Sequence, residues 1–198
     1  MANKVRFGLK KAYYSVVSVA DNVPSFAAPV AMPGAVSISI DPEGDSSSFY
    51  ADDILYDYGS TNNGYKGTLE LALVPDSFWE DVLGMSLDSN SVMIEKATDE
   101  PVYFALLFEF TGDADAIRHC YYYCKASRPK LEGKTKGDSR DVQTTEFDFA
   151  ALPEPGASIV KASTVAATNA ARYEAWYTAV ALPTYASVPA PAKSKKEN

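Results

Sequence analysis

Apolar and polar residues alternate along two stretches of the chain, residues 36–40 and residues 69–73. Alternation with a period of two is typical of a strand with one buried and one exposed face. Residues 102–110 are almost wholly apolar, and they are followed by a Thr-Gly-Asp turn and then by residues 117–125. This order predicts a hairpin at the centre of a sheet.

The pair Asn63-Gly64 is a strong turn signal, because positive φ angles are cheap there. It predicts a hairpin in which residues 54–58 pair with residues 65–74. Further strands are expected over residues 12–20, 91–96, 142–150 and 158–165, which brings the count to about eight.

Two helices are expected. Pro75 suits the first turn of a short helix that Gly84 ends. A second helix is expected over residues 169–181, shortly before Pro183, because Tyr173, Trp176, Tyr177 and Val180 recur at helical spacing.

These elements predict a mainly β (α+β) fold, an antiparallel β-sandwich or partly closed barrel with a flanking short helix and a C-terminal helix. We expect one domain over residues 1–183. Residues 184–198, rich in Ala, Pro and Lys, are expected to form a flexible tail.

The composition fits a folded protein that does not grip nucleic acid. The 198 residues are 46% hydrophobic, and the formal net charge of −8 disfavours binding through phosphate neutralisation. Cys120 and Cys124 lie about 13 Å apart in an extended strand, so a disulfide between them is not expected. Unpaired thiols favour assembly in a reducing cytosol. No apolar run is long enough to span a membrane.

No pattern of catalytic residues is evident. His119 is the sole histidine, and its neighbour Cys120 should point to the opposite face of the strand. Zinc needs about four ligands of suitable type, and there is no glycine-rich nucleotide motif or serine-hydrolase motif. We therefore expect a protein that is not an enzyme, with no catalytic residues, metal or cofactor.

Charge is divided unevenly along the chain. Residues 12–65 contain no Lys or Arg but seven acidic residues. Residues 118–140 are basic, with Arg118, Lys125, Arg128, Lys130, Lys134, Lys136 and Arg140 against two acidic residues. If the two segments lie at opposite ends of the domain, copies can stack head to tail. The alternative is that both are only solvated faces.

Several longer segments resemble one known family. They are NKVRFGLK (3–10), PGAVSISIDPEGD (33–45), FYAD (49–52), NGY (63–65), LELA (69–72), FALLFEF (104–110) and ASRP (126–129), with Tyr173, Trp176, Val180 and Pro183. Together they resemble the major tail protein (tail tube protein) family of long-tailed bacteriophages. The resemblance covers nearly all of residues 3–183 and stops at Thr184.

The resemblance implies a structural virion protein. Such a subunit forms homohexameric rings that stack into a tail tube, and phage DNA passes through the tube without specific binding. The implied partners are other copies, the tape measure protein and the tail terminator and distal tail proteins, with no membrane. The implied location is the virion tail, assembled in the host cytoplasm.

In such tubes the loop between the second and third strands reaches the adjacent ring. In this sequence that loop is expected at Pro42, Glu43, Gly44, Asp45, Ser46, Ser47, Ser48, Phe49, Tyr50, Ala51, Asp52 and Asp53. The basic residues of the 118–140 segment would form the complementary face.

Four side chains are candidates for the lumen, because they alternate with core-facing residues of the inner strands: Ser37, Ser39, Glu70 and Ala72. Acidic and small polar side chains would let DNA slide. The same positions fit equally well on the outer surface or at the ring seams.

A different class of function stays open. A carbohydrate-binding or adhesin-like β-sandwich module needs aromatic stacking faces, and Tyr121, Tyr122, Tyr123 and Trp79 are candidates for them.

Overall fold

The structure is a computed structural model that describes residues 7–112, 116–131, 133, 135 and 142–184. The expected tail, apart from Thr184, lies outside the described residues. The elements are β1 (Leu9–Ala20), β2 (Val23–Phe26), β3 (Val30–Met32), β4 (Ala35–Glu43), β5 (Ser46–Ala51), β6 (Ile54–Ser60), β7 (Gly64–Leu71), α1 (Asp76–Asp81), β8 (Ser86–Leu87), β9 (Met93–Ile94), β10 (Tyr103–Phe110), β11 (Arg118–Ala126), β12 (Thr145–Ala151), β13 (Lys161–Ser163), α2 (Ala170–Glu174) and the 3-10 turn η1 (Ala175–Tyr177).

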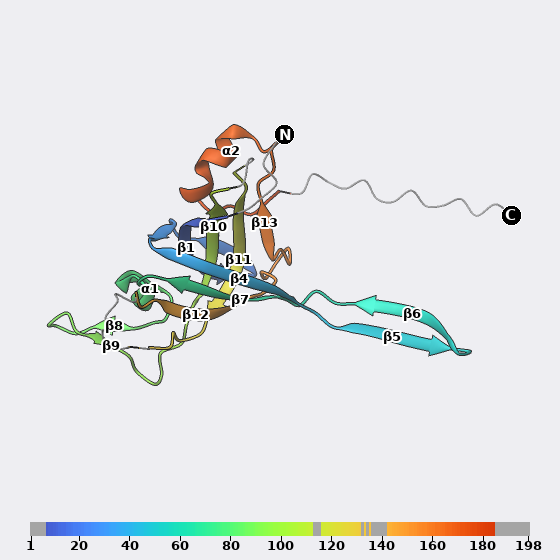
Figure 1. Cartoon of the computed structure of the whole chain (residues 1–198), viewed down its shortest axis with the longest axis horizontal. Coiled ribbons are helices and arrows are strands. Elements are labelled where there is room, and N and C mark those ends of the chain that lie inside the picture. The colour runs from blue at the N-terminus through green and yellow to red at the C-terminus, as the bar shows by residue number, and fades with distance from the viewer. Residues whose placement is uncertain (1–6, 113–115, 132, 134, 136–141, 185–198) are drawn as a thin grey trace.

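One large antiparallel sheet dominates the fold (Figure 1). Strands β2, β1, β10, β11, β12, β7 and β4 are neighbours in this order, with β3 beside β1 and β13 beside β11. The sheet curls until β1 and β4 touch, but no ladder joins these two strands, so it is not a closed barrel. The expected mainly antiparallel β fold with a short flanking helix and a C-terminal helix is confirmed.

The concave side of the sheet holds the main core, which α1 closes. Phe78 of α1 is fully buried, and its ring packs against the rings of Tyr14, Phe104 and Phe147 at centroid distances of 5.0–5.6 Å. These three residues come from β1, β10 and β12. The helix therefore connects opposite parts of the curled sheet through aromatic packing.

A second, smaller core lies on the convex side of β1, β10 and β11. Trp176 is buried there against Leu107, Cys120 and Tyr122. This contact holds α2 and η1 on the sheet. The helix is shorter than the predicted 169–181, and the β-branched Thr178 and Val180 and the nearby Pro183 disfavour its continuation.

The predicted hairpin around Asn63-Gly64 is wrong. Residues 54–60 pair with β5, and β7 pairs with β4. The hairpin that forms is therefore β5–β6, and its turn lies at Asp52-Asp53. Both aspartates have positive φ angles, 50° and 61°, as a two-residue hairpin turn of type I′ requires. Residues 42–53 are therefore not a loop, since they end β4, form β5 and make the turn that follows it.

The central hairpin is confirmed by the antiparallel pairing of β10 with β11. The strands predicted near 91–96 and 158–165 are present only as the short β9 and β13. Cys120 and Cys124 are buried and unpaired. No described helix is long and apolar enough to cross a membrane.

Gly64→Ala is expected to destabilise the fold strongly. Gly64 has a φ of 107°, and a Cβ atom there would lie 2.1 Å from the carbonyl oxygen of Ala151. Backbone strain and displacement of β12 should lower the free energy of unfolding by about 2 kcal/mol or more. Thermal unfolding measures the effect, and Gly133→Ala is the control, because among the described residues the nearest atom to a Cβ at Gly133 would be the Gln143 Oε1 at 3.8 Å. A Gly64→Ala protein as stable as the control would contradict the close approach of Gly64 to β12.

Candidate assembly surfaces

The most prominent feature is a two-stranded arm, which we define as β5, β6 and the Asp52-Asp53 turn, residues 46–60. It projects from the body as the extension of the β4–β7 pair (Figure 1). The ladder continues through the neck between them, where the Thr61 amide donates to the carbonyl of Asp45 at 2.8 Å and the Asn63 amide to that of Glu43 at 2.8 Å. The arm is thus connected in register to the body.

Large apolar side chains cover both faces of the arm. Cross-strand partners share a face, so Tyr50 lies with Leu55 and Ser48 with Tyr58. Phe49 lies on the other face with Tyr56, whose ring is 6.3 Å away. Leu55 and Tyr58 are three residues apart, so regular alternation would place them on opposite faces. The register shift between Phe49 and Tyr50 marks a bulge that brings them to the same face.

These side chains are exposed although they are apolar. Exposed fractions of 53–72% are found for Phe49, Tyr50, Ile54, Leu55, Tyr56 and Tyr58. Such a concentration on one projecting element marks an interaction surface. An isolated two-stranded hairpin is also only marginally stable in water. The arm therefore needs a partner surface.

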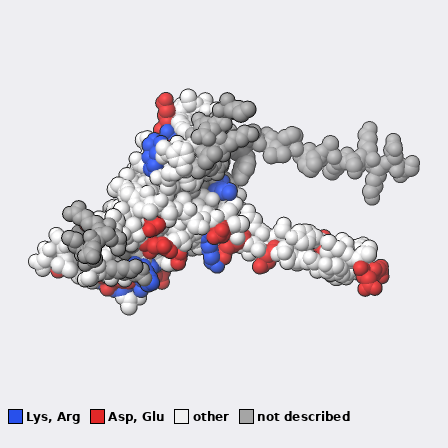
Figure 2. Space-filling view, in the orientation of Figure 1, with Lys and Arg blue, Asp and Glu red and all other residues white. Residues whose placement is uncertain are grey.

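The arm is acidic as well as apolar. Asp52 and Asp53 form its tip, Asp57 lies on β6, and residues 46–63 contain no Lys or Arg. Figure 2 shows the acidic atoms gathered at the tip. A surface that receives the arm must therefore tolerate or attract negative charge.

A second surface is the outward face of β4, β7 and β12, which we call the polar wall. Ser37, Glu70 and Glu146 occupy one row across the three strands, and Ser39, Thr68 and Asp148 the next. Three of the four lumen candidates, Ser37, Ser39 and Glu70, therefore share this face. The fourth, Ala72, is exposed just beyond the end of β7.

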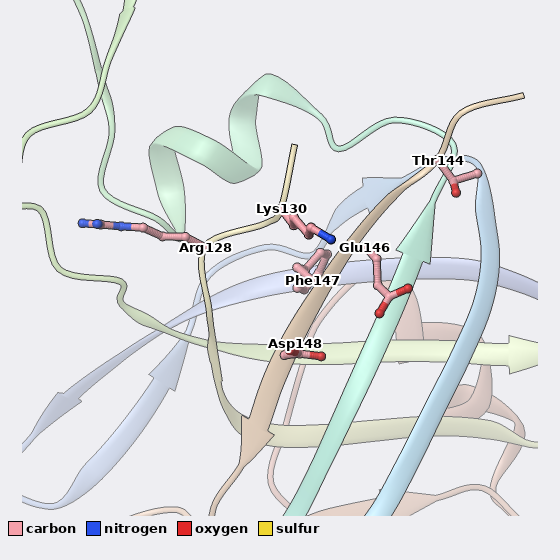
Figure 3. Close-up of a pocket in the computed structure, with 6 residues that line it drawn as sticks. All are labelled: Arg128, Lys130, Thr144, Glu146, Phe147 and Asp148. Carbon is pink, nitrogen blue, oxygen red and sulfur yellow. The ribbon is translucent and has the colours of Figure 1, made fainter. Parts of the chain in front are cut away.

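Hydroxyl groups hold the carboxylates of the wall in place. Glu70 accepts hydrogen bonds from Ser37 at 2.7 Å and from Thr144 at 2.6 Å, and Asp148 accepts one from Thr68 at 2.7 Å. The bonds from Thr144 and Ser37 lower the pKa of Glu70 below its ordinary value. The wall is thus negatively charged at neutral pH. A hollow of about 280 Å³ lies at its edge and is lined by Lys130, Glu146 and Asp148. Figure 3 shows these side chains.

The four described basic residues of the 118–140 segment do not share one face. Arg118 and Lys125 lie at opposite ends of β11, and Lys125 lies over the ring of Tyr103. Arg128 pairs with Glu95 at 2.8 Å, beside β9, and Lys130 lines the hollow. Lys134, Lys136 and Arg140 lie outside the described residues.

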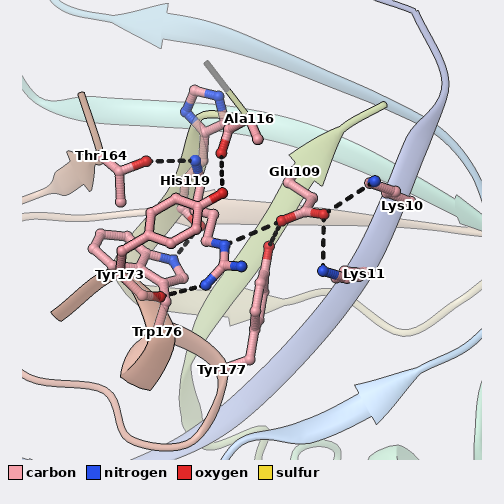
Figure 4. Close-up of polar contacts among 10 residues, drawn as sticks. Lys10, Lys11, Glu109, Ala116, His119, Thr164, Tyr173, Trp176 and Tyr177 are labelled. Carbon is pink, nitrogen blue, oxygen red and sulfur yellow. Dashed lines mark hydrogen bonds and ion pairs between the residues drawn. The ribbon is translucent and has the colours of Figure 1, made fainter. Parts of the chain in front are cut away.

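Arg118 belongs instead to a cluster around a buried carboxylate, Glu109 (Figure 4). The Glu109 side chain is 3% exposed and lies 3.3 Å from Lys10, 3.1 Å from Lys11 and 3.2 Å from Arg118. The Tyr177 hydroxyl also donates to it at 3.1 Å. This Glu109 cluster connects β1, β10, β11 and η1.

Charge and burial compete at Glu109. Burial raises the pKa of its carboxyl, but the hydrogen bonds and charges of Lys11, together with Tyr177 and Lys10, lower it, and the net pKa lies below the ordinary value. Arg118 lies over the Tyr173 ring at 3.7 Å and donates to the Tyr173 carbonyl. The cluster thus fixes the C-terminal helix electrostatically.

The aromatic residues proposed for a carbohydrate site do not present stacking faces together. Tyr121 and Tyr122 are buried, and Tyr123 stacks on Tyr103 at 3.8 Å. Trp79 is half-buried against the main core. His119 and Cys120 point to opposite sides of β11, since His119 stacks on Phe108 while Cys120 lies in the second core. Among the described residues, no cluster of three or more His, Cys, Asp or Glu suits a metal ion.

Comparisons with known proteins give a partial likeness of fold. No protein-family model matches the sequence, and no characterised protein matches it. Among solved structures, the chain is similar to the sheath/tube terminator of an extracellular contractile injection system (PVC) in its extended state. The TM-score is 0.41 at 10% sequence identity, over 78% of this chain and 94% of that chain.

Proposed function

We propose that this protein is a structural, non-enzymatic subunit of a phage tail tube, in which homohexameric rings stack around a channel for DNA. The observation that carries the proposal is the projecting arm, whose two faces are apolar and exposed and which only a partner surface can cover. The sequence resemblance over residues 3–183 supplies the kind of assembly.

The arm suits contact between stacked rings. It extends along the long axis of the molecule, so that the arm and the β8–β9 hairpin lie at opposite ends of that axis (Figure 1). The proposed inter-ring contact thus comprises the predicted residues 42–53 and also β6, which the sequence did not indicate.

The polar wall suits the lumen. The opposite part of the sheet is covered by α2 and η1, whereas the wall is bare and carries Glu70, Glu146 and Asp148. Glu70 and Glu146 face each other directly across two strands, an arrangement that costs stability. Carboxylates that repel phosphate would keep DNA from adhering to the channel.

In this proposal the other partners are the tape measure protein and the tail terminator and distal tail proteins, and the protein resides in the virion tail. No metal or cofactor is required.

Electron microscopy of the purified full-length protein tests the proposal. Rings or tubes of uniform width are the expected result at protein concentrations high enough for self-association. A strictly monomeric protein at high concentration, with and without salt, would contradict it.

Glu70→Lys is expected to leave tubes intact but to make their channel retain DNA. DNA carries one negative charge per about 1.7 Å of its axis, so a cation on each subunit of the bore should bind it in a salt-dependent way. Slower DNA ejection at low salt, from particles shown to contain the variant, is the readout, and Glu70→Gln is the control without the cation. Unchanged ejection would place Glu70 on the outer surface or at a seam.

A further inference from the structure

Two glutamates of the described chain are buried, and their surroundings differ. The Glu109 carboxylate lies within 3.3 Å of three cationic side chains. Glu154 is only 1% exposed, yet among the described residues it forms no ion pair with Lys or Arg. A buried carboxylate without a cationic partner is costly, and buried charges in proteins are therefore usually paired or bound to a metal ion.

The fold uses only one of the two carboxylate oxygens of Glu154. Oε1 accepts hydrogen bonds from the Ala157 amide at 2.8 Å and from the Ile159 amide at 3.3 Å. These bonds close the loop of residues 154–159, in which the Glu154 amide also donates to the Ile159 carbonyl at 3.1 Å. Oε2 is buried and has no hydrogen-bond partner in the described part of the chain. One carboxylate oxygen is thus left to bind a ligand.

Oε2 borders a small space that it shares with a backbone oxygen from a distant segment. A Cβ atom at Gly156 would lie 3.3 Å from Oε2 and 2.7 Å from the carbonyl oxygen of Asn22, in the turn between β1 and β2. Glycine keeps this space clear of a side chain, and it also tolerates the φ of 127° found at position 156. Asn22 and Gly156 are both exposed, so the space lies close to solvent.

The two oxygens define the chemistry of the ligand. A carbonyl and an ionised carboxylate only accept hydrogen bonds, so neither can satisfy the other, whereas a cation would bind both and offset the buried charge. Zn²⁺ favours His and Cys ligands, and Mg²⁺ requires a near-ideal octahedron and gives up its water reluctantly. Ca²⁺ accepts irregular sets of carboxylate, carbonyl and water oxygens.

We infer that Glu154 Oε2 and the Asn22 carbonyl bind one Ca²⁺ ion, whose other ligands are water molecules. Because only one ligand is a charged side chain, the affinity should be weak, with a Kd of about 1 mM. The ion would connect the β1–β2 turn to the loop that follows β12. This inference goes beyond the tail-tube proposal and does not depend on it.

Thermal unfolding of the full-length protein tests the site. After treatment with a chelator, wild-type protein should gain about 3–6 °C in melting temperature when about 10 mM Ca²⁺ is added. The same concentration of Mg²⁺ screens surface charge equally and should stabilise the protein much less. Glu154→Gln should remove the difference between the two ions, and Glu174→Gln, an exposed change on α2, should preserve it.

The order of stabilities gives a second readout. The Gln amide still offers an oxygen to the Ala157 and Ile159 amides, and it presents an N–H donor in place of Oε2 without a buried charge. Glu154→Gln should therefore be at least as stable as wild type in chelator and less stable than wild type in Ca²⁺.

Equilibrium dialysis with radioactive Ca²⁺ counts the ion directly. Wild-type protein should bind about one Ca²⁺ more per chain than Glu154→Gln. Gly156→Ala keeps the carboxylate but puts a methyl group into the shared space, so it should lose the same ion and serves if Glu154→Gln does not fold. Equal stabilisation of wild-type protein by Ca²⁺ and Mg²⁺ would overturn the site whichever variant folds. Equal Ca²⁺ binding by wild type and Glu154→Gln would also overturn it.

Discussion

Replacing residues 46–60 with an Asn-Gly turn is expected to abolish tube formation and to leave the body folded. The Thr61 amide already donates to the Asp45 carbonyl at 2.8 Å, which is the hydrogen bond that closes a two-residue hairpin loop. The shortened chain can therefore turn at the neck without disturbing β4 or β7. All six exposed apolar side chains of the arm are removed at once.

We expect this deletion to affect assembly far more than the stability of the body. None of the removed residues belongs to either hydrophobic core, so the melting temperature should change by only a few degrees. Size-exclusion chromatography and electron microscopy should show monomers or unstacked rings at concentrations where wild-type protein forms tubes.

A control variant separates the shape of the arm from its charge. Asp52→Asn with Asp53→Gly keeps the turn geometry, because Asn-Gly favours the same positive φ angles, but removes two negative charges from the tip. It should still form tubes, with weaker dependence of the assembly rate on salt. Long tubes from the armless variant would refute the role assigned to the arm.

The arm shows where the sequence was informative and where it was not. Asn63-Gly64 is the stronger turn signal, but Asp also tolerates the left-handed region, and the turn forms at Asp52-Asp53. An apolar run such as Ile54–Tyr58 indicates that the segment will be buried. It does not distinguish burial in the chain's own core from burial against a neighbour.

The polar wall was easier to predict, because strict alternation along β4 and β7 assigns each residue to a face. Its third strand was missed, since Glu146 and Asp148 reach the wall only through the pairing of β12 with β7, which is not local in sequence. The described cations of the basic segment are dispersed for a related reason. An extended strand separates Arg118 from Lys125 by about 23 Å, so closeness in sequence does not make one surface.

Glu109→Gln is expected to lower the free energy of unfolding at pH 7 by about 3 kcal/mol. The substitution removes one partner of a buried ion pair and leaves Arg118, whose side chain is only 12% exposed, without its carboxylate. Lys10 and Lys11 lose their common partner, and the Tyr177 hydroxyl loses a charged acceptor. Urea unfolding measures the effect, and Glu174→Gln, an exposed change on α2, should alter stability by less than about 0.5 kcal/mol.

The pH dependence of the same variant tests the cause. Because the folded pKa of Glu109 is lower than the ordinary value of about 4.3, the unfolded chain binds the proton more readily. The stabilisation is therefore fully present above about pH 5 and is lost as the pH falls through the folded pKa. A protonated Glu109 resembles Gln, so the stability difference between wild type and variant should shrink toward zero in acid. A difference that stays constant from pH 7 to pH 3 would show that packing of the side chain, and not its charge, holds the C-terminal helix on the sheet.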